Sequence, residues 1–115
     1  MTLDPLVFAA FLAMPGAVFA HHGWSEYDSG TTLTLTGAIV EAGYEHPHGF
    51  VTLRVDGKAW TAVLAPPSRM DNRGLPRADL VPGAKVTVVG YPNRNKPDEM
   101  RAERISIGGR TVELR

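Results

Sequence analysis

Residues 51–64, VTLRVDGKAWTAVL, decide the fold because they hold two strands and the turn that joins them. Val51, Leu53 and Val55 alternate with polar residues, and this period of two is typical of a strand with one buried face. The pair Asp56-Gly57 follows at once and favours a two-residue hairpin turn, in which both residues need positive φ. On the far side of the turn, alternate residues again face inward: Trp60, Ala62 and Leu64. The stretch therefore predicts an antiparallel hairpin.

The segment before this hairpin has the same pattern. Leu33, Leu35, Gly37 and Ile39 alternate with threonines and an alanine, which predicts an earlier strand.

After the hairpin, Pro66-Pro67 ends the strand because proline has no N–H to donate to a ladder. Ser68 is expected to cap a short helix over residues 69–73. Gly74 is expected to close that helix in the left-handed conformation.

The last third of the chain predicts further strands. Pro82-Gly83 indicates a turn, and residues 86–90 alternate as a fourth strand. Residues 100–107 form a fifth, in which Ala102 and Ile105 are out of phase, so we expect a bulge or bend between them. Residues 111–114 are candidates for a short edge strand.

This order of elements predicts an all-β fold: a small five-stranded, OB-fold-like barrel with one short helix between strands 3 and 4. Closure would hide sheet edges that an open sheet exposes, and a small open β-sandwich is the main alternative. The chain has no cysteine, so core packing alone must hold the domain together. The expected core is Leu33, Leu35, Ile39, Val51, Leu53, Val55, Trp60, Ala62, Leu64, Val86, Val88, Ile105 and Ile107.

The N-terminus predicts export. Residues 6–14, LVFAAFLAM, are an apolar run, and Ala17 and Ala20 supply the small residues that a signal peptidase reads. We therefore expect a signal peptide over residues 1–20 and one mature domain over 21–115, periplasmic or secreted after cleavage near Ala20. The run is too short for a permanent membrane anchor. The alternative is a buried N-terminal helix.

The charge composition narrows the function classes. The chain has 12 basic and 12 acidic residues, whereas a dedicated nucleic-acid binder usually has a marked basic excess. We therefore expect no nucleic-acid partner. The sequence contains no phosphate-binding loop, no dinucleotide fingerprint and no Gly-x-Ser-x-Gly element, so it favours a binding protein over an enzyme.

Short motifs in a fixed order resemble a known family across nearly the whole mature chain. They are Ala20-His21-His22-Gly23, Tyr27-Asp28, Leu35-Thr36-Gly37, Pro47-His48, Trp60, Pro67-Ser68-Arg69-Met70, Arg73-Gly74, Pro82-Gly83 and Gly109-Arg110. On these the chain resembles an uncharacterised family of small exported bacterial proteins, domain of unknown function 6152. The family usually has Asn before the Pro-His pair, where this chain has His46. The resemblance implies export and this kind of fold, and it implies no activity.

All four histidines lie in two short pairs, His21-His22 and His46-Pro47-His48. Cleavage after Ala20 would give His21 a free α-amine beside its imidazole, and such nitrogen ligands suit Cu(II). In an extended segment His46 and His48 point to the same face and can share a metal. The alternative is that His48 is a structural hydrogen-bonding residue and that His46 is simply exposed.

Two aromatic residues stand in the irregular segment before the first strand. Trp24 and Tyr27 either pin this segment to the barrel or shape a pocket beside the histidines.

Two functions follow from these features. The first is an exported periplasmic binding domain that takes a transition metal, copper, through His21, His22, His46 and His48. The second is a metal-free OB-fold module that binds a peptide, a glycan or a periplasmic protein partner. A histidine–copper centre could also be redox-active, and the sequence says nothing about the oligomeric state.

Overall fold

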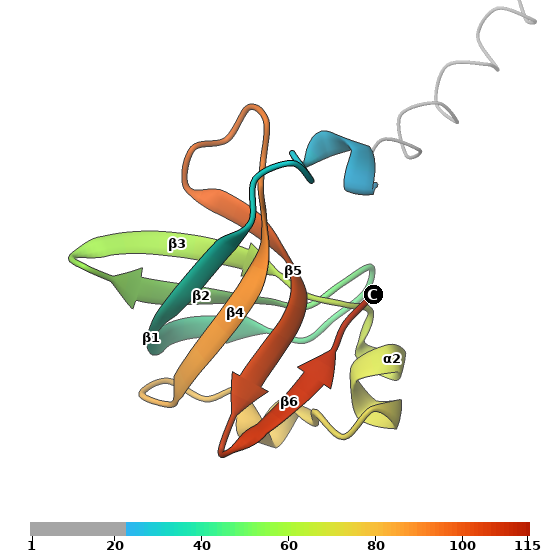
Figure 1. Cartoon of the computed structure of the whole chain (residues 1–115). Coiled ribbons are helices and arrows are strands. Elements are labelled where there is room, and N and C mark those ends of the chain that lie inside the picture. Colours follow the sequence, from blue (N-terminus) through green and yellow to red (C-terminus); the bar gives the residue numbers. More distant parts are fainter. Residues whose placement is uncertain (1–22) are drawn as a thin grey trace, which may run out of the picture.

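The computed structural model describes residues 23–115 (Figure 1). The predicted signal peptide, residues 1–20, lies outside this range, as do His21 and His22. Among the described residues, no helix is long and apolar enough to cross a membrane. The elements in chain order are η1 (Trp24–Glu26), β1 (Leu33–Gly43), β2 (Phe50–Val55), β3 (Lys58–Val63), α2 (Pro67–Asn72), η2 (Arg77–Asp79), β4 (Lys85–Pro92), β5 (Glu99–Ile107) and β6 (Arg110–Glu113).

Five strands close into a barrel in the order β3-β2-β1-β4-β5. The neighbours in this order pair antiparallel, and a short parallel pairing of β3 with β5 closes the ring. With α2 lying between β3 and β4, this is OB-fold topology and confirms the predicted fold class. The expected edge strand is β6. It pairs with residues 104–107 of β5, beyond the pairing of β5 with β3, and lies beside α2 in Figure 1.

The turn and bulge predictions are confirmed. Asp56 and Gly57 both have positive φ, 49° and 80°, as the hairpin requires. In β5, Arg104 pairs with Val89 and Ala102 pairs with Gly90, so the residue between them is the extra one of a bulge. A second bulge, at Val40 in β1, had no sequence signal. It leaves the Val40 side chain exposed while β1 continues to Gly43.

The core lies inside the barrel, and most of the residues predicted for it are buried. Four of them are only partly buried and pack against the core from its edge: Leu33, Val55, Trp60 and Ile107. For Trp60 this corrects the expectation of a core position, since the Lys58 ammonium group lies 4.2 Å from the centre of its ring.

The helix begins two residues earlier than expected, and Ser68 does not cap it. Pro66 is the N-cap residue and makes no side-chain hydrogen bond there. Pro67 fits the first turn because its missing N–H would have had no partner in the helix. The C-terminal prediction is confirmed: Gly74 has φ of 86°. Leu75 N–H donates to the Met70 carbonyl at 2.8 Å, which completes a Schellman motif.

Candidate functional site

The candidate site lies where two loops meet the barrel. One is the β1–β2 loop, residues 44–49, which carries His46 and His48; the other is the β4–β5 loop, residues 93–98. In OB-folds the corresponding loops flank the ligand-binding face of strands 2 and 3. Two pockets open here, and His48 lines both of them.

Gly49 fixes the position of His48. Its N–H donates to the Ala65 carbonyl at 2.9 Å, and its carbonyl accepts from Leu64 N–H at 2.8 Å. A Cβ at this position would meet Gly43 O and Met70 Cε at 2.8 Å, so only glycine fits so close to the barrel. The side chain of His48, the preceding residue, is therefore held at the barrel surface.

The first pocket, which we call the histidine pocket, has a volume of about 330 Å³. Tyr44, Glu45, His46, His48, Phe50 and Arg77 contribute to its lining. The Tyr44 hydroxyl donates to the Leu75 carbonyl at 2.6 Å and is 2.9 Å from Asp71 Oδ1. Arg77 donates to the Tyr44 carbonyl at 3.0 Å, so the segment after β3 supports this loop.

The two histidines of this loop share the histidine pocket, although the backbone is not extended as expected. Residues 46–47 form a turn with a cis peptide bond. His46 is exposed, and His48 is half-buried with its Nδ1 buried and without a hydrogen-bond partner.

Within residues 23–115, no group of three or more His, Asp or Glu side chains is placed to hold a metal ion. A site of three or more such ligands that uses His46 and His48 would therefore need a ligand from outside residues 23–115. His21 and His22 lie outside that range.

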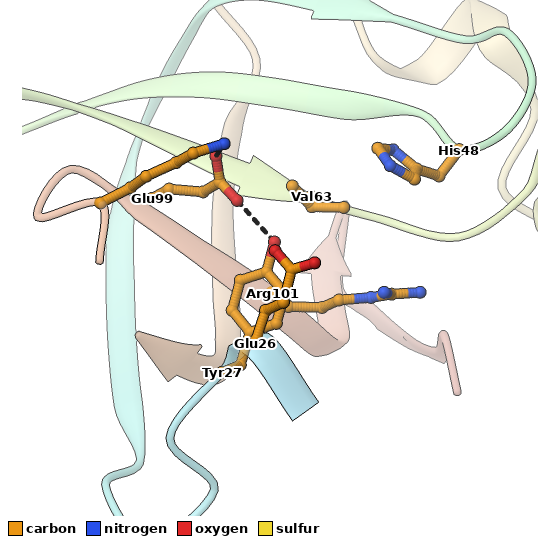
Figure 2. Close-up of a pocket in the computed structure, with 7 residues that line it drawn as sticks. Glu26, Tyr27, His48, Val63, Glu99 and Arg101 are labelled. Atoms are coloured by element: carbon orange, nitrogen blue, oxygen red, sulfur yellow. Dashed lines mark hydrogen bonds and ion pairs between the residues drawn. The ribbon is translucent and has the colours of Figure 1, made fainter. Parts of the chain in front are cut away.

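The second pocket, which we call the arginine pocket, has a volume of about 170 Å³. Figure 2 shows Glu26, Tyr27 and Arg101 along one side and His48, Val63 and Glu99 along the other. Lys96 of the β4–β5 loop completes the lining. The lining residues come from distant parts of the sequence, and closure of the barrel through β3 and β5 brings them together.

The Glu99 carboxylate at this pocket is already engaged. Tyr27 donates its hydroxyl proton to Glu99 Oε2 at 2.5 Å, and Asn93 Nδ2 lies 3.3 Å from the same oxygen. The Lys96 ammonium is 3.8 Å from Oε1. Burial, and then the bond to Glu99, raise the pKa of Tyr27 well above its usual range, so this hydroxyl remains a donor.

Trp24 pins the N-terminal segment to the barrel. Its ring packs edge-on against Tyr91, with centroids 6.1 Å apart. The guanidinium groups of Arg101 and Arg115 lie 4.5 and 4.4 Å from the centre of the Trp24 ring. Tyr27, a few residues later, lines the pocket that holds His48. Of the two predicted roles, Trp24 thus pins the segment to the barrel, and Tyr27 shapes a pocket beside a histidine.

Sequence reasoning missed Arg101, Glu99, Lys96 and Glu26 as candidate site residues. The out-of-phase pattern of the fifth strand was visible, but an outward-facing arginine on such a strand looks like any solvated charge. No local signal marks it as the neighbour of His48.

The family match agrees with the motif order described above. The model of the family of unknown function DUF6152 matches residues 10–100. The chain belongs to this family. No curated protein matches this DUF6152 member.

Solved structures similar to this family member share its fold. One is the S. pombe Stn1–Ten1 complex, with 17% identity and a TM-score of 0.54 over 66% of this chain and 57% of that chain. Another is TiaS bound to tRNA, AMPCPP and agmatine, with 22% identity and a TM-score of 0.52 over 70% of this chain and 19% of that one. The DUF6152 chain thus spans less than two thirds of either protein, and at these identities the likeness shows the fold alone.

Proposed function

We propose that this DUF6152 protein is an exported, periplasmic binding domain that takes a transition metal, copper, through His21, His22, His46 and His48. The observation that carries the proposal is the position of His48, which lines the histidine pocket together with His46 and the arginine pocket together with Glu26. The proposed activity is binding, not catalysis.

The N-terminal histidines are within reach of this loop. Glu26 lines the same pocket as His48, and His22 precedes Glu26 by four residues. An extended chain spans at most about 3.5 Å per residue, so His22 lies within roughly 14 Å of Glu26 along the backbone. This short connection supports a site in which the N-terminal pair and His48 bind the same ion.

The donor chemistry favours copper. Cleavage after Ala20 would leave His21 with an α-amine and an imidazole, which can chelate one ion. His48 would add a further nitrogen, and His22 or His46 would complete the set. Cu(II) binds such nitrogen ligands more strongly than Zn²⁺ does in the usual order of divalent ions. Ligand imidazoles must be neutral, so copper affinity should fall in acid.

A Cu(II) titration followed by electron paramagnetic resonance tests the proposal. It compares protein that starts at His21, the same protein with one extra residue before His21, and His48→Ala. Blocking the α-amine and removing the imidazole should each weaken binding. Glu41→Gln is the control, because Glu41 is exposed on β1, lines neither pocket and is not one of the proposed ligands. Equal copper affinity in all four proteins would contradict the proposal.

A second candidate function is a metal-free module that binds a peptide, a glycan or a protein partner. The location of both pockets, beside the loops with which OB-folds hold ligands, favours it. Of the similar structures, one is a protein complex and the other is bound to tRNA, so both involve binding. This module becomes the better explanation if the copper titration fails.

A further inference from the structure

Two polar atoms stand out because both are buried and neither has a hydrogen-bond partner: His48 Nδ1 and Arg101 Nε. They come from a loop and a strand that are far apart in the sequence, yet both residues line the arginine pocket. Buried polar groups in native proteins are nearly always paired, so two unpaired atoms on residues that line one cavity indicate an absent partner.

Within residues 23–115, the positive charge of Arg101 also has no direct partner. No hydrogen bond or ion pair joins its guanidinium to a side chain there, although Trp24 holds the group by stacking at 4.5 Å. Burial lowers the pKa of Arg101, and the like charges of Arg69 and Arg115 act in the same direction. Arginine still remains charged, so the Arg101 guanidinium is a positive charge without a direct ion-pair partner in this part of the chain.

Neither acidic residue of the pocket is paired with Arg101. Glu99 is engaged by Tyr27, Asn93 and Lys96. Glu26 lines the pocket and attracts Arg101 at a distance, but it makes no ion pair with it. Glu26 would therefore repel an incoming anion and weaken its binding.

From this arrangement we propose that the arginine pocket binds an oxyanion group, a carboxylate or a phosphate, on the guanidinium of Arg101. The planar guanidinium presents paired N–H donors that match two oxygens of such a group. The cavity of about 170 Å³ is smaller than the ~300–1,000 Å³ usual for drug-sized ligands, so it accepts a small group and not a ring system. The group is either a free ion or the acidic end of a larger partner.

The test uses metal-free mature protein and ¹H–¹⁵N NMR. The probes are the Arg101 side-chain Nε–H signal and the backbone N–H signals of Tyr27, His48 and Glu99, which line the same pocket. Sodium acetate and sodium phosphate are added at constant ionic strength, with sodium chloride as the reference. The Arg101 signal should shift saturably with acetate or phosphate and not with chloride. Followed by the backbone signals, Arg101→Lys should weaken binding about tenfold or more, because it removes the paired donors while keeping the charge. Glu26→Gln should strengthen binding.

Arg104→Lys is the matched control. Arg104 lies on the same strand, is paired with Glu113 at 2.9 Å, and lines neither pocket. This variant should bind like the unmodified protein. Shifts that never saturate, or that are as large with chloride as with acetate or phosphate, would overturn the proposal. Backbone signals that shift equally in Arg101→Lys and in the unmodified protein would also overturn it.

Two peptide arms identify the source of the group. A short acidic peptide and a phosphoserine peptide are titrated beside the free ions. If a peptide shifts the same Arg101 signal at a concentration about tenfold lower than acetate or phosphate does, the group belongs to a protein partner. Equal or weaker peptide binding assigns the site to a free ion. Because the test contains no metal and changes no histidine, its outcome is independent of the proposed copper site.

Discussion

Two tyrosine hydroxyls connect the loops of the candidate site to the rest of the fold. Tyr44 joins the β1–β2 loop to the segment around Leu75, and Tyr27 joins the N-terminal segment to Glu99. Both hydroxyls act as donors, so both must stay protonated. Burial, followed by the hydrogen bond to Asp71, raises the pKa of Tyr44 from 10.0 to about 12. The segments that form the site are thus held in place by two neutral tyrosine hydroxyls, each beside a carboxylate.

These tyrosines make the protein sensitive to alkali. A phenol whose pKa is raised on folding stabilises the protein fully below its unfolded pKa, near 10, and this stabilisation is lost as pH rises through the folded value. We expect the free energy of unfolding, measured in urea from pH 8 to pH 12, to fall above about pH 10. Tyr44→Phe should cost about 1 kcal/mol at neutral pH and flatten this fall.

Tyr91→Phe is the control, because the Tyr91 hydroxyl has no hydrogen bond to a side chain in the described part of the chain. It should leave the alkaline fall unchanged. If Tyr44→Phe also leaves it unchanged, Tyr44 does not control the response to alkali.

At the scale of elements, β4 and β5 approach each other closely at Gly90. Arg101, which lines the arginine pocket, lies on β5 at this contact. At the bulge of β5, Gly90 pairs with Ala102, and β5 passes directly over the place where a side chain of Gly90 would stand. A Cβ there would lie 1.9 Å from the Arg101 carbonyl oxygen.

Gly90→Ala should therefore destabilise the barrel by about 1–3 kcal/mol, because the backbone of β5 must move to accept the methyl group. Thermal unfolding followed by circular dichroism measures the effect. Gly23→Ala is the matched control: a Cβ there meets nothing within 4 Å, and the backbone is ordinarily extended. A Gly90→Ala protein as stable as the Gly23→Ala protein would contradict the close approach.

On the scale of the whole molecule, the N-terminal segment is part of the folded domain from Gly23 onward. Asp28 N–H donates to the Pro92 carbonyl and Arg94 N–H donates to the Glu26 carbonyl, both at 2.9 Å. Cleavage after Ala20 would therefore remove no residue that the structure describes. The folded domain is therefore compatible with the removal of a signal peptide that ends at Ala20.

We expect the protein recovered from the periplasm or medium of its own host to begin at His21. Intact-mass spectrometry decides this, and a mass that includes residues 6–14 would show an anchor or a buried helix instead. Ala20→Arg should block cleavage and make the longer precursor accumulate, because the peptidase needs a small residue there.

The backbone plan follows from the sequence alone. Period-two alternation indicates which face of each strand is buried, Asp56-Gly57 fixes the hairpin, and Gly74 ends the helix, since each signal acts through the backbone conformation of its own neighbourhood. The bulge near Ala102 is visible for the same reason. The predicted start of the helix was wrong, because the fixed φ of Pro67 sets the first turn and no cap at Ser68 is needed.

The candidate site is a different case, because it was decided by tertiary structure. His48 was visible as a histidine next to a proline, but Arg101 gains its role only when β3 pairs with β5 and Trp24 folds over the strand. Whether a charged side chain finds a partner depends on every group that surrounds it in space. Those groups come from distant parts of the chain, as with Trp24 and Arg101, which are 77 positions apart. Local patterns carry no information about such neighbours, so only the closed barrel shows which charge is left unpaired.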